Sequence, residues 1–362
     1  MYKNDNRIVM TLDAGGTNLV FSAIQGGREI VAPVTLPAAS DHLETCLSNL
    51  VKGFTSIRNC LPASPVAISF AFPGPADYAA GIIGDLPNFP SFRGGVALGP
   101  FLEETFGIPV FINNDGNLFA YGEALTGLLP EVNRRLEEAG SIKRYKNLLG
   151  ITLGTGFGAG VVINGELLCG DNGCGGDVWC FRNKKYPSYI VEESVSIRAV
   201  QRVYAERSGD SSELTPKDIF DIAEGKRPGC REAAVDAFSE LGEMAGDAIA
   251  SAITLVDGLV VIGGGLAGAS KYILPALINE LRASTGMMSG YRFDRLQMKV
   301  FHLDNPQEFA HFAQGEAVKI AIPGTERLVD YDPFKRIGVS VSHQGANRSI
   351  AMGAYLYALN HL

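Results

Sequence analysis

Two glycine-rich segments and a carboxylate between them are the residues of this chain best suited to chemistry. The first segment is Asp13-Ala-Gly-Gly-Thr17, the second is Leu153-Gly-Thr-Gly-Phe-Gly-Ala-Gly160, and Asp115 follows an apolar stretch between the two. Successive backbone N–H groups in glycine-rich turns bind anions such as phosphates. A positioned carboxylate can take a proton from a hydroxyl. The order of these residues is therefore what the transfer of a phosphoryl group to a hydroxyl requires.

The first glycine turn stands between two apolar stretches that predict strands. We expect Gly15 and Gly16 to adopt positive φ and to let a ligand approach the backbone closely. Thr17 can add a hydroxyl donor, and Asp13 can hold a metal-bound water. An ordinary hairpin turn is an equal alternative. No Gly-Lys-Ser/Thr follows, so the segment is not a Walker A loop.

Two later glycine runs also favour tight turns. The density of glycines over residues 154–176 excludes a helix there, and apolar strands on both sides favour an ordered hairpin over a flexible loop. Gly263-Gly264-Gly265 stands between a predicted strand and a predicted helix. By itself this run is weak evidence for a nucleotide, because a tight strand–helix turn uses the same residues.

Asp115 follows a predicted strand at 110–113 and opens a predicted helix. Asn and Asp are favoured at helix N-caps, so capping is the first alternative for this residue. Both roles can coexist, because a carboxylate at the C-terminal end of a strand in an open α/β lobe faces the usual binding crevice.

The same opening of strand, glycine turn and strand occurs twice, about 140 residues apart. We interpret it as an internal duplication that gives two α/β lobes with a cleft between them. The predicted strands are 8–12, 19–24, 30–36, 66–71, 110–113, 147–153, 160–163 and 259–262. The predicted helices are 41–54 with Asp41 as its cap, 116–128, 235–256, 271–283 and 346–359. The segment 300–342 has weak periodicity and receives no assignment.

Composition narrows the classes of function. Of the 362 residues, 46% are hydrophobic and 19% are charged, which suits folded lobes and argues against disorder. The net charge of −8 speaks against a nucleic-acid partner, whose usual footprint is a basic patch. No apolar run is long enough to span a membrane, and the polar start lacks a signal segment. Six scattered cysteines favour reduced thiols, so we expect a cytoplasmic protein.

Taken together, these motifs resemble the ROK family of sugar kinases and sugar-responsive repressors, within the actin-like/hexokinase ATPase superfamily. The resemblance spans nearly the whole chain and rests on order and spacing. Its markers are Asp13-x-Gly-Gly-Thr17, Phe72-Pro-Gly-Pro75, Asn88, Asn114-Asp115 followed by Ala120 and Glu123, Leu153–Gly160, Val261-Ile-Gly-Gly-Gly265 and Gly353-Ala354. It implies an α/β protein with the two-lobed actin-like ATPase (ribonuclease H-like) fold and an interlobe cleft. Residues 1–120, completed by helix 346–362, would form the smaller lobe, and residues 121–345 the larger lobe with the nucleotide site.

The resemblance also implies roles for particular residues, with ATP and Mg²⁺ as cofactors. Asp115 would be the general base that takes the proton of the attacking sugar hydroxyl. The sugar would contact Gly74, Asn114 and Glu192, although from the residues alone the default role of Glu192 is in the electrostatics of a helix start. Asn88 is most often a turn residue, and it could bond a polyol. The phosphates with Mg²⁺ would lie on Asp13, Gly15, Gly16, Thr17, Gly154, Thr155 and Gly156, and the adenosine on Gly263, Gly264 and Gly265.

One segment departs from the family pattern. The family usually has Gly-Glu-x-Gly-His after the second glycine loop, whereas this chain has Gly173-Cys174-Gly175-Gly176-Asp177. Cys174 thus replaces a sugar-binding Glu, and Asp177 replaces a His and becomes the candidate for the sugar contact. The chain from Asp177 to Glu192 is too short for the family's zinc loop and offers only Cys180. We therefore expect no structural zinc and a sugar preference in which glucose is not clearly the best substrate.

An ATP-dependent sugar kinase is the leading hypothesis. A sugar-binding or sensing protein with little or no catalysis is the alternative, favoured by Cys174 and Asp177. A DNA-binding repressor of the same family is disfavoured, because the first strand begins at Ile8 and leaves no room for a helix-turn-helix region ahead of it. The sequence does not name the sugar and leaves a homodimer open.

Overall fold

The chain folds into two compact units. The structure is a computed structural model that describes residues 2–84 and 89–362, so Asn88 lies outside the described residues. Unit 1 comprises Met1–Thr126, Leu167–Gly175 and Asn347–Leu362, and unit 2 comprises Gly127–Glu166 and Gly176–Ala346.

The sheet of unit 1 brings the ends of three strands to one edge. Its strands are β1 Val9–Ala14, β2 Asn18–Gln25, β3 Arg28–Glu29, β4 Val34–Pro37, β5 Ala67–Ala71 and β8 Val110–Asn113. Their order is β3-β2-β1-β5-β8, with β4 also paired to β2. Strands β1 and β2 form an antiparallel hairpin, whereas β5 and β8 run parallel to β1, so that Asp13, Ala71 and Asn113 lie in register. The first glycine turn and Asp115 therefore follow strands that end at the same edge.

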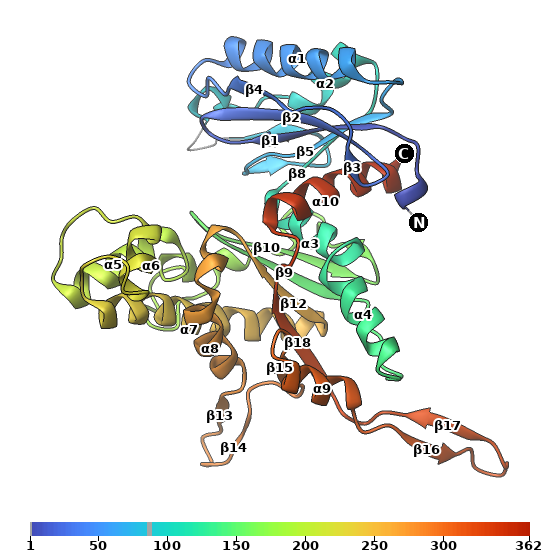
Figure 1. Ribbon diagram of the computed structural model, residues 1–362, viewed down its shortest axis with the longest axis vertical. Coiled ribbons are helices and arrows are strands. Elements are labelled where there is room, and N and C mark those ends of the chain that lie inside the picture. Colours follow the sequence, from blue (N-terminus) through green and yellow to red (C-terminus); the bar gives the residue numbers. More distant parts are fainter. Residues whose placement is uncertain (1, 85–88) are drawn as a thin grey trace. The chain divides into compact units, whose positions relative to one another are not determined.

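Helices cover both faces of this sheet (Figure 1). Helices α1 and α2 lie on one face and α3 and α10 on the other. The bounds are α1 Leu43–Cys60, α2 Leu98–Phe106, α3 Asp115–Leu125 and α10 Ala346–His361, with the short elements η1 Tyr2–Asn4, β6 Ala76–Asp77, β7 Ile82–Ile83 and η2 Pro90–Phe92. A buried aromatic cluster joins α1 to the sheet, with the rings of Phe54 and Phe21 edge to face at 5.0 Å.

Helices α3 and α10 touch backbone to backbone. A Cβ built on Gly122 of α3 would lie 1.9 Å from the carbonyl oxygen of Ser349, and one on Gly353 of α10 would lie 1.9 Å from that of Leu118. The hydroxyl of Ser349 donates a hydrogen bond to the fully buried carboxylate of Glu123 at 2.5 Å. This crossing fixes α3, whose first residue is Asp115.

The sheet of unit 2 repeats the strand order of unit 1. Its strands are β9 Leu148–Leu153, β10 Phe157–Ile163, β11 Glu166–Leu167, β12 Leu259–Gly263, β15 Lys299–His302 and β18 Arg336–Val341. The order is β11-β10-β9-β12-β18-β15, again an antiparallel hairpin followed by parallel strands. The repeated topology agrees with the duplication inferred from the two glycine turns.

The remaining elements of unit 2 pack around that sheet. They are α4 Leu128–Glu138, α5 Ile197–Ser208, α6 Pro216–Ala223, α7 Arg231–Val256, α8 Ser270–Leu281 and α9 Pro306–Gln314, with η3 Val178–Cys180, η4 Val191–Glu193 and η5 Gly265–Ala269. The buried core joins the strands to α7 and α8, where Phe238, Ile249 and Leu277 are fully buried.

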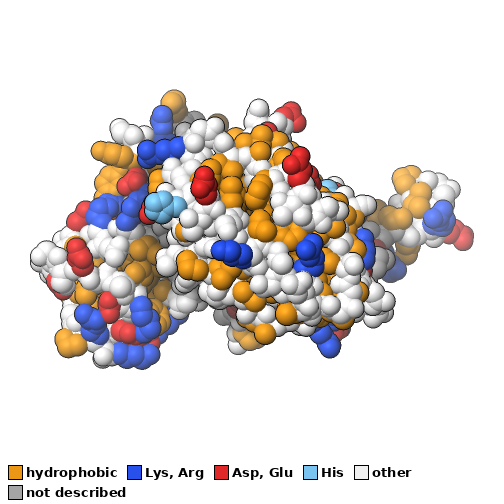
Figure 2. All heavy atoms as spheres, turned by 90° about the horizontal axis from the view of Figure 1, so that it is seen from above, with side chains coloured by type: hydrophobic (Ala, Val, Ile, Leu, Met, Phe, Trp, Pro, Cys, Tyr) orange, Lys and Arg blue, Asp and Glu red, His pale blue; other side chains and the backbone are white. Residues whose placement is uncertain are grey.

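Two hairpins also belong to unit 2, and the second lies within the segment 300–342 that received no assignment from sequence, together with α9 and β18. One pairs β13 Ser284–Gly286 with β14 Arg292–Asp294, and the other pairs β16 Val318–Ala321 with β17 Leu328–Tyr331. The second hairpin projects at the right of Figure 1, and Figure 2 shows hydrophobic side chains on it.

Three sequence-based boundaries are wrong. Asp41 does not cap α1, because the turn closed by the N–H of His42 on Ala39 places His42 at the N-cap, without a side-chain cap bond. The predicted strand 30–36 is two short strands, β3 and β4. The predicted helix 116–128 ends at Leu125, and α4 starts separately at Leu128.

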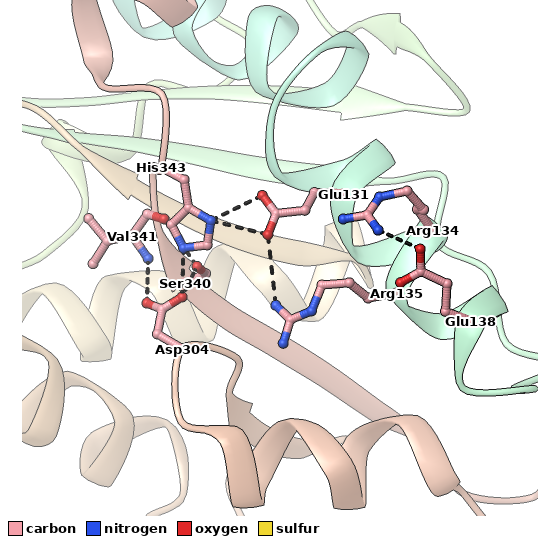
Figure 3. A network of polar contacts seen from close by, with 8 residues as sticks. All are labelled: Glu131, Arg134, Arg135, Glu138, Asp304, Ser340, Val341 and His343. Carbon is pink, nitrogen blue, oxygen red and sulfur yellow. Dashed lines mark hydrogen bonds and ion pairs between the residues drawn. The ribbon is translucent and has the colours of Figure 1, made fainter.

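A histidine joins three segments of unit 2 (Figure 3). His343 Nδ1 lies 3.0 Å from Glu131 Oε2 on α4, and its Nε2 lies 3.0 Å from Asp304 Oδ1 ahead of α9. Asp304 also accepts hydrogen bonds from the hydroxyl of Ser340 and the N–H of Val341. Partial burial opposes it, but the two carboxylates raise the pKa of His343. Burial likewise disfavours charge on Asp304, yet the hydrogen bonds it accepts hold its pKa far below the usual range.

No helix among the described residues is long and apolar enough to cross a membrane. The six cysteines, all of which the structure describes, form no disulfide.

Candidate functional site

The first glycine turn is open to a ligand. Asp13, Gly15, Gly16 and Thr17 are all exposed, and the N–H of Gly15 bonds the carbonyl of Asn18 at 2.9 Å. The expectation of positive φ is wrong for both glycines, since neither adopts it. A Cβ on Gly16 would meet no atom within 4 Å. The turn itself therefore does not require glycine at that position, and the missing side chain leaves backbone that a ligand can approach.

Asp115 is free of the capping role. The N-cap of α3 is Asn114, whose side chain accepts a hydrogen bond from the N–H of Asn117 at 2.6 Å. Asn113 steadies this cap, because its side-chain oxygen accepts from the N–H of Asn114 and from the amide of Asn117. The capping alternative for Asp115 is thus wrong. Its carboxylate accepts the N–H of Gly116 at 2.8 Å, and among the described residues no side chain donates to it.

The surroundings of Asp115 make its carboxyl more basic. Surrounding protein atoms desolvate the carboxyl and raise the pKa of Asp115, although the side chain is still exposed to solvent. The hydrogen bond from Gly116 opposes this shift, and the negative charge of Asp13 adds to it. A carboxylate with a raised pKa is a better general base near neutral pH. Asp115 thus has the exposure and the basicity that proton abstraction requires.

Gly74 follows β5 at the same edge of the unit 1 sheet. It is exposed, and a cis peptide bond joins it to Pro75. A Cβ on Gly74 would lie 2.9 Å from the hydroxyl of Tyr78, which donates to the carbonyl of Phe72. Unit 1 therefore gathers Asp13, Gly74 and Asn114 near the ends of neighbouring strands. Their predicted contacts with a ligand stay predictions.

Sequence reasoning missed Cys169. Residues 167–175 belong to unit 1, and there burial raises the pKa of the Cys169 thiol, while the nearby side chains of Asn113 and Tyr357 lower it. Cys169 thus lies near the residue that steadies the α3 cap. No local pattern marks this role, which depends on contacts distant in sequence. Cys174, by contrast, is exposed and its thiol bonds the carbonyl of Asn172.

In unit 2, Glu192 supports the second glycine turn. Its Oε2 accepts the N–H of Phe157 at 3.0 Å, and a Cβ on Gly156 would lie 2.5 Å from the same oxygen. Its Oε1 accepts from Arg198 at 3.0 Å. The turn Gly154–Gly156, with Thr155 exposed at its tip, is closed by the N–H of Gly154 on the carbonyl of Gly156. Glu192 therefore holds this turn, and its predicted contact with the sugar stays a prediction.

Asp177, the other sugar candidate of unit 2, is half-buried. It precedes η3 without capping it by its side chain, and its carbonyl accepts from the thiol of Cys180. Among the bonds given by the described residues, none engages its carboxylate, which is therefore free to accept from a ligand.

The three glycines at 263–265 differ in what the fold requires of them. Gly263 ends β12, in register with Thr152 of β9. Gly264 adopts φ +87, and a Cβ there would lie 2.3 Å from the carbonyl oxygen of Leu153, so glycine is required by the fold. Gly265 is exposed, and a Cβ there would meet no atom within 4 Å, so its backbone is open. The second and third glycine runs thus follow parallel strands of unit 2 at one sheet edge.

Ion pairs hold the segment in which the family places its zinc loop. Lys184 pairs with Glu243 of α7 and Glu280 of α8, both at 2.8 Å, and Lys185 pairs with Glu240 of α7 at 2.7 Å. Within the described ranges, no group of three or more His, Cys, Asp or Glu side chains is arranged to bind a metal ion. The absence of structural zinc stays a prediction for elemental analysis.

Comparison with known proteins identifies relatives over most of the chain. The model of the ROK family matches residues 9–288. An N-acetyl-D-glucosamine kinase of Photobacterium profundum is 28% identical over 273 residues, which are 70% of this chain and 82% of that protein. A glucokinase of Thermotoga maritima is 27% identical over 291 residues, 74% of this chain and 84% of that protein.

Solved structures have the same fold. The crystal structure of a glucokinase from Parabacteroides distasonis is 75% identical and covers 100% of both chains, with a TM-score of 0.94. A ROK hexokinase from Thermus thermophilus is 21% identical over 98% of this chain and 99% of that chain, with a TM-score of 0.66. The predicted fold class, the two-lobed actin-like ATPase fold, is confirmed.

Proposed function

The chain belongs to the ROK family, and on that premise we propose that it transfers a phosphoryl group from ATP to a sugar hydroxyl, with Asp115 as the general base. The state of Asp115 carries the proposal. Its side chain is exposed and does not cap α3, and its pKa is raised. It also lies in the same unit as the open turn at Asp13–Thr17. The curated relatives named as sugar kinases and the 75% identical glucokinase support it.

The residues suit each part of such a reaction. The carboxylate of Asp115 would take the proton as the sugar hydroxyl attacks. Exposed backbone at Gly16 and Gly265 would admit phosphate and adenosine. Phosphoryl transfer needs little further covalent chemistry from a protein beyond positioning and charge stabilisation.

The chemistry of Asp13 fits Mg²⁺. Its carboxylate is exposed and has no hydrogen bond or ion pair among those of the described residues, and carboxylate oxygens are ligands that Mg²⁺ prefers. Asp13 would hold the ion directly or through water. When bound, Mg²⁺ neutralises charge on the phosphates. The adjacent negative charge at Asp115 favours a cation at this edge of the sheet.

The test is an ADP-release assay over hexoses, N-acetylhexosamines and ketoses, on wild type and Asp115→Asn. The variant keeps the size of the side chain but loses the base, so turnover should fall by roughly 10²–10⁴-fold while sugar binding persists. Asp41→Asn makes the same change at an exposed carboxyl that caps no helix, and should match wild type. Wild-type turnover in Asp115→Asn would exclude the mechanism. No sugar-dependent ADP release from wild type would favour the alternative of a sugar-binding sensor.

The choice of sugar is tested in the same screen. A neutral His offers one hydrogen-bond donor and one acceptor, whereas an ionised Asp offers acceptors only. Asp177 would therefore require a hydrogen-bond donor from the sugar. We propose that Asp177→Ala reorders the preference among sugars and leaves the KM for ATP nearly unchanged. The glucokinase that is 75% identical makes glucose the first sugar to test, against the expectation that glucose is not clearly preferred.

A cytoplasmic location and the absence of a nucleic-acid partner are proposals as well, supported by the net charge of −8 and the unpaired cysteines. A homodimer is likewise a proposal.

A further inference from the structure

One buried asparagine of unit 2 uses every hydrogen-bonding site of its side chain. Asn183 is fully buried, and its amide oxygen accepts the N–H groups of Lys185 and Tyr186, both at 3.0 Å. Its amide nitrogen donates to the carbonyl of Ile190 at 3.2 Å and to the hydroxyl of Ser194 at 2.8 Å. An asparagine side chain offers two donors and two acceptor sites, so all four are engaged. A buried polar group that is fully satisfied specifies one arrangement of the chain around it.

The two bonds that Asn183 donates lie on either side of Glu192. Ile190 and Ser194 are the N-cap and the C-cap of η4, the short helix whose middle residue is Glu192. A helix of three residues has too few internal hydrogen bonds to be stable by itself. The position of η4 therefore depends on contacts outside it, and the amide of Asn183 holds both of its ends.

The chain around Asn183 forms a closed loop over residues 181–191. The N–H of Val191 donates to the carbonyl of Phe181 at 2.7 Å, and the N–H of Asn183 donates to the carbonyl of Tyr189 at 3.0 Å. Ion pairs from the two lysines that follow Asn183 join the loop to α7 and α8. The loop is thus closed at its base and fixed to the core helices of unit 2, and Asn183 bonds across it to η4.

Glu192 extends this chain of contacts to the second glycine turn. Its Oε2 accepts the N–H of Phe157 at 3.0 Å, and a Cβ on Gly156 would lie 2.5 Å from the same oxygen. The carboxylate therefore lies directly against the backbone of the turn. A displacement of η4 that lengthened the bond to Phe157 beyond about 3.5 Å would break it.

We propose that Asn183 is a positioning residue for the glycine turn Gly154–Gly156, acting through η4 and Glu192. The proposal rests on the proposed function in so far as this turn holds the phosphates of ATP. Loss of the Asn183 amide removes the bonds at both ends of η4 at once, so Glu192 is no longer held against the turn. The effect falls on the affinity for ATP and not on proton transfer, because Asp115 belongs to unit 1.

Amide hydrogen exchange at Phe157 tests the positioning without a kinase assay. In wild type without nucleotide, the bond to Glu192 should protect this N–H. Asn183→Ala should speed its exchange by about tenfold, the worth of one hydrogen bond. Asn183→Asp should do the same, because an ionised Asp keeps the two acceptor sites and has no donor for η4. Asn133→Ala on α4 is the matched control. Asn133 also bonds backbone through both ends of its amide, at Tyr145, and its loss should leave the Phe157 exchange rate unchanged.

The KM for ATP gives a readout that a merely structural role would not move. Asn183→Ala should raise it by roughly tenfold and leave kcat little changed, since ground-state binding is lost and the base is not. Combined with Glu192→Ala, the same substitution should add nothing. Substitutions that act through one chain of contacts are not additive, and Asn183 reaches the turn only through Glu192.

Each outcome decides for or against the proposal. Unchanged exchange at Phe157 in both Asn183 variants would overturn it, and so would a further rise in the KM for ATP when Asn183→Ala is added to Glu192→Ala. If circular dichroism shows that the Asn183 variants do not fold, Ser194→Ala removes one of the two anchors of η4 and should give smaller changes in the same direction. A wild type without sugar-dependent ADP release would refute the proposed function, and the exchange rates would still decide whether Asn183 positions the turn.

Discussion

Substitution of Gly353 by alanine tests whether the contact between α3 and α10 holds α3, the helix that begins with Asp115. In most helices this change stabilises, by up to about 1 kcal/mol, because alanine has the higher helix propensity. Here the new Cβ would lie 1.9 Å from the carbonyl oxygen of Leu118, although ordinary contact begins at 3.4 Å. The helices would have to separate by about 1.5 Å, since a backbone carbonyl in a helix cannot rotate away.

The overlap should outweigh the gain in propensity. Overpacking in a close-packed interior costs about 1–3 kcal/mol and occasionally more, and here the obstacle is rigid backbone on both sides. We expect Gly353→Ala to destabilise unit 1 by about 2 kcal/mol, which lowers Tm by about 4–8 °C for a domain of this size. Because Asp115 is the first residue of α3, turnover of the folded variant should fall as well.

Thermal melting by circular dichroism gives the measurement. Gly122→Ala is the reciprocal change, with a Cβ 1.9 Å from the carbonyl oxygen of Ser349, and should have a similar effect. Gly268→Ala in η5 is the control, because no atom lies within 4 Å of its Cβ and its φ is not positive. The control should stay within about 0.5 kcal/mol of wild type. An unchanged or higher Tm for Gly353→Ala would refute the argument that this crossing admits only glycine.

Two further predictions concern unit 2. The pKa of His343 is raised in the folded chain, so the stability it contributes is complete below its unfolded pKa, near 6.5, and is lost as pH rises through its folded pKa. The Tm difference between wild type and His343→Gln should therefore shrink as pH rises above about 6.5. A difference that grows with pH would contradict this. Glu192→Ala removes the acceptor of the Phe157 N–H and should raise the KM for ATP roughly tenfold or more. Glu193→Ala, which also loses a bond to Arg198, should not, and a rise confined to the KM for the sugar would show that Glu192 acts only on the sugar.

The sequence predicts those elements whose signal is local. Val110–Asn113 is a strand with the predicted bounds, because a short apolar run between turn residues can form little else. Asn164 and Gly165 form a turn with positive φ at both residues, which this residue pair favours in a hairpin. Asp115 could be identified from the sequence because it directly follows a predicted strand and lies between the two glycine-rich turns. The cap assignment failed because Asn114 and Asp115 are adjacent and equally suited to cap a helix.

What the sequence does not predict depends on contacts between distant residues. Cys169 lies near Asn113 because residues 167–175 join unit 1, although the surrounding chain belongs to unit 2. The hairpin of β16 and β17 lacks the buried face whose periodicity reveals a strand, so this part of 300–342 gave no pattern. The sequence correctly indicated a turn at Gly15, but positive φ is not the reason for the glycine, because the backbone there does not adopt it.

The duplicated topology places a titratable residue at the corresponding position of each unit. Asp115 stands two residues after the end of β8, and His343 stands two residues after the end of β18, the strand at the corresponding place in the second sheet. Both positions carry a titratable group with a raised pKa. The histidine has both ring nitrogens engaged, by Glu131 and Asp304, so it cannot accept a proton from a substrate (Figure 3). The carboxylate of Asp115 accepts from neighbouring backbone N–H groups only and stays open to solvent, so the same position joins segments in one unit and leaves a carboxylate accessible in the other.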